Sequence, residues 1–276
     1  MSSDAEPRRT STLEEIGATT LHLMRVAGGL GVTWISAFRA ARAPGAGARA
    51  VCRGIALRQI FYTSFQALGL ISVVAMFIGA TLIVQTELLA GAFERETAGR
   101  VLVAIVLREL APLVTAILVA GRSGTAIATE LGVMRVNSEV LALASLGIDP
   151  PRFLVWPRIV ATIVSLPILT VYFSAMAVVG GSIAAFAMDP HGAPDWLAGI
   201  SAGLTPVDLP LFLTKAVGMG GIVGWLCSYY GLDVGTSPTE VPIKASRAVV
   251  QTLLACIIFN AVATVLFYWV SGARLA

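Results

Sequence analysis

The chain has 276 residues, of which 57% are hydrophobic and only 13% are charged, and its mean hydropathy is +0.84. This composition excludes an ordinary soluble globular domain and indicates a polytopic membrane protein. The formal net charge is only +3, and no basic stripe or interleaving of basic and aromatic residues points to nucleic-acid binding.

The N-terminal region is predicted to contain two parts. Residues 1–12 are polar, which predicts disorder, and no apolar stretch follows Arg8 and Arg9, so they do not form a signal peptide. A capping box at residues 12–15 then begins a segment with apolar residues at helical spacing. We expect residues 13–59 to hold an amphipathic helix on the membrane surface and a linker. A short buried helix in a soluble segment is the alternative.

Five apolar runs are long enough to cross about 30 Å of hydrocarbon. They cover residues 60–84, 101–121, 153–187, 209–230 and 249–271. The third run is long for one crossing, and we expect Pro157 and Pro167 to kink it or its excess length to tilt it. The predicted fold is therefore all-α, with the interfacial helix followed by five transmembrane helices.

The distribution of arginine predicts the orientation. Eight arginines precede Ile60, whereas the loop 189–208 has no lysine or arginine. The positive-inside rule therefore predicts a cytoplasmic N-terminus and, after five crossings, a C-terminus on the opposite side. In the outer loop Trp196 is expected to anchor the chain at the membrane interface.

A charged segment joins spans two and three. Residues 125–146 fit a helix but carry Glu130, Arg135 and Glu139, and each charge costs about 2.5–3.5 kcal/mol at the centre of a bilayer. We therefore predict a cytoplasmic helix that ends at Gly147, a suitable left-handed cap, before the sequence Asp149-Pro150-Pro151. A re-entrant or merely surface-bound connector is the alternative.

Two charged residues lie inside apolar spans. Glu109 and Lys215 are at similar predicted depths, roughly 10 Å below the outer boundary, and isolated charges there are costly. We expect them to pair or to share a hydrated cavity, and a purely structural ion pair is the alternative. Gln85, near the outer end of the first span, is a third candidate for lining such a cavity.

Several kinds of site are missing from the sequence. The three cysteines and two histidines show no metal-ligand spacing. There is no phosphate-binding loop, no His-Glu-x-x-His and no Gly-x-Ser-x-Gly motif. The sequence therefore predicts no cofactor, no metal and no catalytic residue, and any ATPase that drives the protein must be another polypeptide.

The run LRELAPLVTAILVAGRSGTAIATELGVMRVNSEVLALASLGIDP, with the following LVWPR and the later KAVGMGGIVGWLCSYYGLDV and TxEVPIKASRAVV, closely resembles the MlaE/YrbE family of permease subunits. These subunits belong to ABC lipid transporters associated with MCE-domain proteins. The resemblance covers residues 60–276 as one permease domain. It implies a homodimer in the bacterial inner membrane, with its C-terminus in the periplasm. The implied partners are a cytoplasmic ABC ATPase, a periplasmic MCE protein and phospholipid.

The resemblance also assigns roles to residues. It implies that Glu109 and Lys215 lie in or near a lipid cavity. It makes the helix at 125–146 the coupling helix that docks on the ATPase, for which the candidate residues are Glu130, Arg135, Glu139, Asp149 and Pro150.

Two other functions remain open. One is a permease of the same family for another hydrophobe, such as a sterol or a polyprenyl lipid. The other is an ATP-independent channel or an intramembrane enzyme that uses Glu109.

Overall fold

The computed structural model describes residues 46–89, 95–188, 193–205 and 208–272, and all regular elements in these ranges are helical. Five helical stretches are long and apolar enough to cross a membrane: Cys52–Thr86, Gly99–Val136, Pro151–Met188, Asp208–Leu232 and Glu240–Trp269. The predicted all-α fold with five spans is confirmed. The predicted interfacial helix lies outside the described residues as far as position 45.

The first span belongs to one uninterrupted helix, α2 (Ala46–Leu89), of 44 residues. The helix begins well before the predicted start of the span at Ile60, because Arg49, Arg53 and Arg58 are compatible with a helix and no proline lies between Ala46 and Leu89. At 1.5 Å per residue α2 is about 66 Å long, roughly twice the thickness of the hydrocarbon. It must therefore tilt or extend beyond the bilayer.

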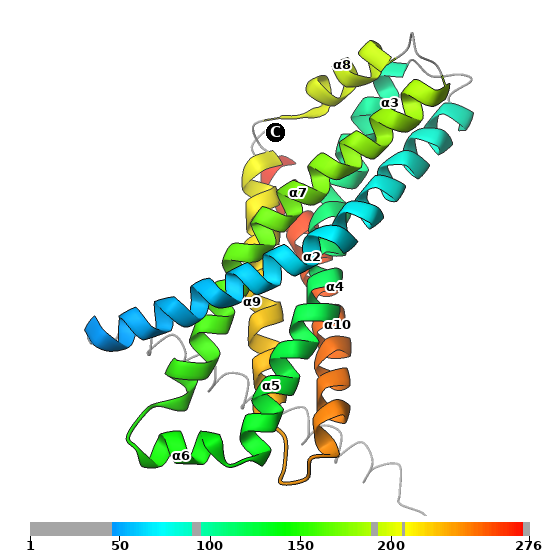
Figure 1. The fold of residues 1–276 in the computed structure, drawn as a ribbon. Helices are drawn as coiled ribbons and strands as arrows, with labels where there is room; N and C mark the ends of the chain where they lie inside the picture. The colour runs from blue at the N-terminus through cyan, green and yellow to red at the C-terminus, as the bar shows by residue number, and fades with distance from the viewer. Residues whose placement is uncertain (1–45, 90–94, 189–192, 206–207, 273–276) are drawn as a thin grey trace, which may run out of the picture.

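Helix α2 packs along α7 (Trp156–Met188), and the two run side by side in Figure 1. Small residues bring the two backbones together. A Cβ atom on Gly79 would lie 1.9 Å from the carbonyl oxygen of Ala177, and one on Gly180 would lie 2.3 Å from that of Met76. Close approach at small residues is a common way to stabilise helix pairs in lipid, where no hydrophobic force joins them.

This contact predicts opposite effects for two similar substitutions in α2. Gly79→Ala should destabilise the protein by about 1–3 kcal/mol, because the added methyl group forces the backbones apart. Gly69→Ala adds the same methyl group where no atom lies within 4 Å, and should be neutral or stabilising because alanine favours a helix. Thermal unfolding in detergent measures both, and equal midpoints would contradict the packing described here.

The second span combines five helical segments without a break. They are α3 (Arg95–Leu102), the π-helical η1 (Val103–Leu110), α4 (Ala111–Val119), the π-helical η2 (Ala120–Gly124) and α5 (Thr125–Val136). The short helix α6 (Glu139–Ser145) follows, and a third π-helical turn, η3 (Pro151–Val155), leads into α7. The remaining helices are α8 (Ala193–Gly203), α9 (Asp208–Leu232) and α10 (Glu240–Gly272). Figure 1 shows α3 and α8 at one end of the molecule, and α6 with the α9–α10 connection at the other.

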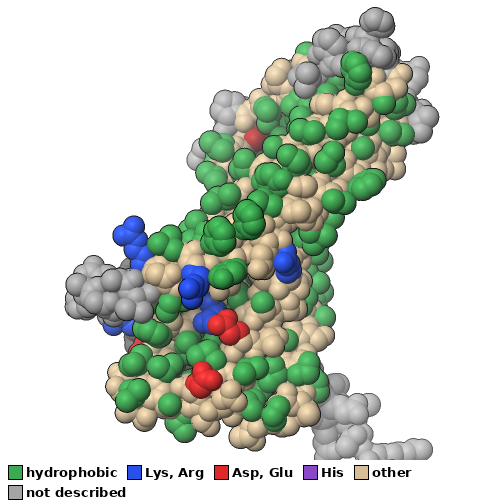
Figure 2. All heavy atoms as spheres, in the orientation of Figure 1, with side chains coloured by type: hydrophobic (Ala, Val, Ile, Leu, Met, Phe, Trp, Pro, Cys, Tyr) green, Lys and Arg blue, Asp and Glu red, His purple; other side chains and the backbone are tan. Residues whose placement is uncertain are grey.

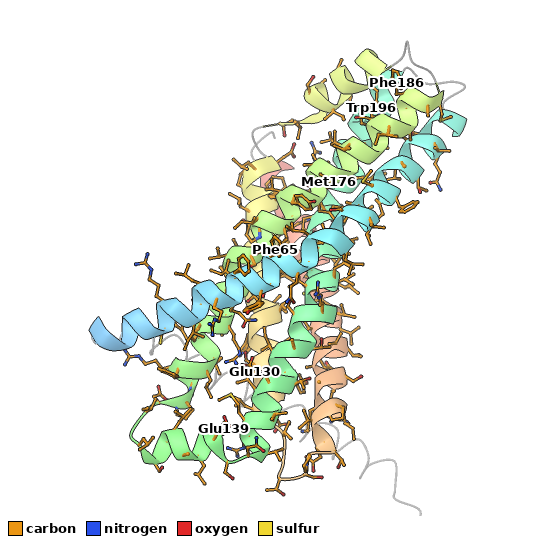
Figure 3. The ribbon with its side chains drawn as sticks, viewed as in Figure 1. Phe65, Glu130, Glu139, Met176, Phe186 and Trp196 are labelled. Carbon is orange, nitrogen blue, oxygen red and sulfur yellow. The ribbon has the colours of Figure 1, made fainter. Side chains whose placement is uncertain are left out.

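Trp196 corrects one expectation. It lies on α8 with only 1% of its surface exposed, so it is not an anchor at the membrane surface. A Cβ on Gly181 of α7 would lie 3.0 Å from the Trp196 ring, and Figure 3 shows Trp196 between α8 and α7. The connection between α7 and α9 thus contains a helix that the tryptophan packs against the bundle.

Burial differs strongly between the last two spans. Half of the most apolar stretch of α9 is buried, against 11% of that of α10. Helix α9 therefore forms the centre of the bundle, whereas α10 packs on it with one side and leaves a broad apolar face open. The exposed residues of that face include Leu254, Ile258, Val262, Val265 and Trp269.

Candidate functional site

The structure brings Glu109 and Lys215 together. The Lys215 Nζ atom, on α9, lies 2.8 Å from Oε1 of Glu109, on η1. The Lys215 side chain is completely buried, whereas 32% of the Glu109 side chain is exposed. We expected Glu109 and Lys215 to pair or to share a hydrated cavity, and the structure confirms that they pair directly.

Polar groups from α10 complete this cluster. The Asn260 amide nitrogen donates to Oε2 of Glu109 at 3.0 Å, and the Thr264 hydroxyl donates to Oε1 at 3.0 Å. Lys215 also donates to the backbone carbonyl of Arg108 at 2.9 Å. The carboxylate thus accepts hydrogen bonds from two helices, which offsets the cost of keeping it charged away from water. We call Glu109, Lys215, Asn260 and Thr264 the charged cluster.

The π-helical turn of η1 helps to place two adjacent charges on different partners. The amide of Ala111 donates to the carbonyl of Val106, five residues back, as in a π-helix. While Glu109 points to the charged cluster, Arg108 turns to the start of α9. Its Nε lies 2.8 Å from Oδ1 of Asp208 and its Nη2 3.1 Å from Oδ2. Such π-turns occur often at functional sites.

Gln85 does not belong to this cluster. It is exposed near the end of α2, and none of the hydrogen bonds found within the described ranges joins it to Glu109 or Lys215. Its predicted role in lining a lipid cavity stays a prediction. Its position near the end of the first span indicates a depth in the membrane but not the helix face on which Gln85 lies.

The predicted coupling helix is two helices. Helix α5 continues the second span to Val136, and α6 begins only at Glu139. Ser138 separates them with a φ of 60°, a left-handed conformation that turns the chain. No glycine or proline marks this break in the sequence.

The predicted end of the segment is confirmed in detail. Gly147 has a φ of 74°. Its amide donates to the carbonyl of Ala144, and the amide of Ile148 donates to that of Leu143, both at 3.0 Å. These are the two hydrogen bonds of a Schellman motif, which requires the left-handed residue that glycine supplies. The exposed Asp149 and the adjoining Pro150 follow, before the chain enters η3.

The candidate coupling residues lie in two different settings. Glu130, on α5, has its Oε2 2.9 Å from Nη2 of Arg158, on α7, whose side chain is only 5% exposed. Arg135 and Glu139 are exposed at the α5–α6 turn, and the contact of Glu139 with the Asn137 amide is long, at 3.4 Å. Figure 3 shows Glu139 nearer the end of the molecule than Glu130.

The α6 end has the surface of a contact site. Leu141 and Leu146 are 67% and 75% exposed, next to Glu139. Figure 2 shows most of the charged side chains on this face gathered around the start of α2 and the α5–α6 end, whereas the rest of the face is largely hydrophobic. Apolar side chains bordered by charges are typical of a surface that binds another protein.

Sequence reasoning missed several residues of these sites. Asn260 and Thr264 are polar residues four positions apart in an apolar span, a spacing that places them on one helix face and that could have revealed them. No sequence pattern singled out Arg158 or Asp208 as a site residue. Among the residues that the structure describes, no group of three or more His, Cys, Asp or Glu side chains could hold a metal ion.

The described residues form an all-α bundle of five helices long and apolar enough to cross a membrane, with an ion pair inside it. An exposed turn joins α5 and α6 at one end, at residues 136–139, and we call it the α5–α6 elbow. The family model described as permease MlaE matches residues 56–266. The chain therefore belongs to the MlaE permease family, as the sequence motifs predicted.

Individual relatives agree with the family model. A probable ABC transporter permease protein of Rickettsia felis is 31% identical over 213 residues, covering 77% of this chain and 82% of the relative. The intermembrane phospholipid transport system permease protein MlaE of Haemophilus influenzae is 29% identical over 216 residues, with the same coverage. The chloroplastic protein TRIGALACTOSYLDIACYLGLYCEROL 1 of Arabidopsis thaliana is 28% identical, covering 79% of this chain and 63% of its own length.

Proposed function

We propose that this chain is the membrane-spanning subunit of an ABC transporter that moves phospholipid between the bacterial inner membrane and a periplasmic MCE protein. Hydrolysis of ATP takes place in a separate cytoplasmic subunit. Membership of the permease family and the name of the Haemophilus relative support the lipid substrate.

The observation that carries the proposal is the charged cluster. Charges within membrane spans are expensive and usually serve a pathway or a site. Here Lys215 is fully buried, while a third of Glu109 stays exposed beside α10. A phospholipid head group carries a phosphate and hydrogen-bond donors or a cation. In this proposal Lys215 turns from Glu109 to the phosphate when lipid enters, and Glu109 balances Lys215 when no lipid is bound.

A second copy of the chain completes the site in this proposal. Helix α10 supplies Asn260 and Thr264 to the cluster and has the largest exposed apolar face of the five spans. Packing of this face on its counterpart in another copy encloses the exposed side of Glu109. The homodimer then holds two clusters around one lipid cavity.

The ATPase docks on the α5–α6 elbow in this proposal. Leu141 and Leu146 supply apolar contact, while Arg135, Glu139 and Asp149 supply polar contacts around it. Because α5 is continuous with the second span, which carries Glu109, a force applied at the elbow can reach the charged cluster along one helix. The cytoplasmic N-terminus predicted from the arginines places this elbow on the side of the ATPase.

A photoreactive residue at position 264 tests the lipid site. In the complex with its ATPase we expect it to crosslink phospholipid with a yield that changes between the ATP-bound and nucleotide-free states. A photoreactive residue at position 77, where the exposed Phe77 of α2 faces outward, is the control and should give a constant yield. Absence of lipid from position 264 in both states would remove the cavity role and leave a structural ion pair.

A further inference from the structure

We infer that a second lipid site lies on the flank of the bundle, between η1, α7 and the start of α9. It holds one acyl chain of a zwitterionic phospholipid, and the head group rests against the ion pair of Arg108 and Asp208. The site does not depend on the proposed transport function, because it is defined by a pocket and a charged rim.

The pocket is apolar below its rim. It has a volume of about 240 Å³. The apolar side chains that line it are Val103, Leu107, Val171, Leu204, Leu209 and Phe212. Val171, Leu204 and Leu209 are 57%, 48% and 62% exposed, so the pocket opens to the outside of the bundle and a chain can enter from the bilayer. Clefts of this kind bind apolar ligands, with a few polar groups to orient them.

The rim supplies those polar groups. Arg108 and Asp208 line the same pocket, and their side chains are 22% and 15% exposed. Arg108 also donates to the carbonyl of Gly203, and Asp208 accepts from the amide and hydroxyl of Thr205. The pair is therefore fixed in place at the turn between α8 and α9. It presents one positive and one negative group side by side, which complements the phosphate and the amine of a zwitterionic head group.

The charged rim and the apolar pocket are arranged in the same order as the head group and the acyl chain of a lipid in the bilayer. Asp208 is the first residue of α9, the fourth helix long and apolar enough to cross a membrane. Because charges are costly in hydrocarbon, we expect the ion pair at the level of the head groups. Val171 lies near the middle of α7, which runs from Trp156 to Met188. A head group at the rim thus places its acyl chain in the apolar pocket.

A second groove in the same protein serves as a control. It lies between α2 and α7, has a volume of about 310 Å³, and is lined only by apolar side chains and a glycine. Its lining includes Val73, Phe77 and Ile183. Ile183 and Val171 are both β-branched residues of α7, and each is 57% exposed. The control groove differs from the proposed site in having no charged rim.

The test uses the purified full-length chain in vesicles of phosphatidylethanolamine and phosphatidylglycerol, without nucleotide. A trace of either lipid carries a photoreactive group within one acyl chain, and peptide mass spectrometry locates the crosslinks. We expect the phosphatidylethanolamine probe to label Leu107 and Phe212 several-fold more than Val73 and Phe77. Val171→Trp, which fills the pocket, should lower the labelling of Leu107 and Phe212 several-fold, whereas Ile183→Trp should leave it unchanged.

Replacement of Arg108, the positive charge of the rim, distinguishes a specific lipid site from ordinary contact with the bilayer. Arg108→Gln should abolish the preference for phosphatidylethanolamine over phosphatidylglycerol in the pocket, with the thermal midpoint recorded as a check on folding. If that variant does not fold, the two tryptophan variants decide the question, because both substitutions are on the exposed surface. Equal labelling of the two grooves, or no effect of Val171→Trp, would overturn the inference, while the charged cluster and its test at position 264 would be unaffected.

Discussion

Replacement of Glu109 by glutamine should destabilise this protein more than replacement of Lys215 by methionine. Both changes remove one charge and keep nearly the same volume. In Glu109→Gln the completely buried Lys215 keeps its charge with only neutral acceptors, one of them the carbonyl of Arg108. In Lys215→Met the carboxylate keeps its hydrogen bonds from Asn260 and Thr264 and is partly exposed. We expect losses of about 3 kcal/mol and about 1–2 kcal/mol, respectively.

The double variant separates stability from function. Glu109→Gln with Lys215→Met contains no unpaired charge, so its stability should return to within about 1 kcal/mol of the original protein. If the pair serves only to hold the helices together, lipid transport should return as well. We expect transport to remain lost, because neither charge is left to meet a head group.

Thermal unfolding measures the stability of each variant, and lipid transfer by the reconstituted complex measures its transport activity. Asn260→Leu is a useful companion variant, since it removes one hydrogen bond to Glu109 from α10 and leaves the ion pair intact. Full transport activity in a stable double variant would show that the pair is structural.

Sequence reasoning correctly predicted the pairing of Glu109 with Lys215 and the helix end at Gly147. Glu109 and Lys215 stand out because a charge within an apolar span needs a partner. Two opposite charges at the same depth are therefore expected to pair with each other. Gly147 stands out because few residues other than glycine adopt the left-handed conformation that ends α6. In both cases one physical requirement dominates the local sequence.

The expectations that failed depended on weak local preferences. The break at Ser138 could not be predicted, because serine has no strong preference for the left-handed conformation and tertiary packing determines the turn. Trp196 fits the composition of an interfacial anchor, yet Gly181 leaves room for its ring inside the bundle.

Glu130 and the exposed pair Arg135 and Glu139, all candidate coupling residues, should respond differently to substitution. Glu130→Gln leaves the buried Arg158 without its carboxylate, and the remaining hydrogen bond of Arg158 is to the carbonyl of Leu154, in the preceding helical turn. We expect a loss of about 2 kcal/mol, even though the Glu130 side chain is 57% exposed. Its effect on ATPase coupling should follow this loss of stability.

The double variant Arg135→Ala with Glu139→Ala should keep the stability of the protein but weaken its action with the ATPase. Both side chains are exposed, and the contact of Glu139 with Asn137 is weak, so each change should alter stability by no more than about 0.5 kcal/mol. If the elbow docks on the ATPase, the loss of both charges should weaken association or lipid-stimulated hydrolysis by about tenfold, which corresponds to about 1.4 kcal/mol at the interface. Thermal unfolding of the isolated chain and hydrolysis by the assembled complex measure the two effects. An unstable double variant would contradict the expected stability, and a stable one with normal association and hydrolysis would show that the ATPase does not dock on these two side chains.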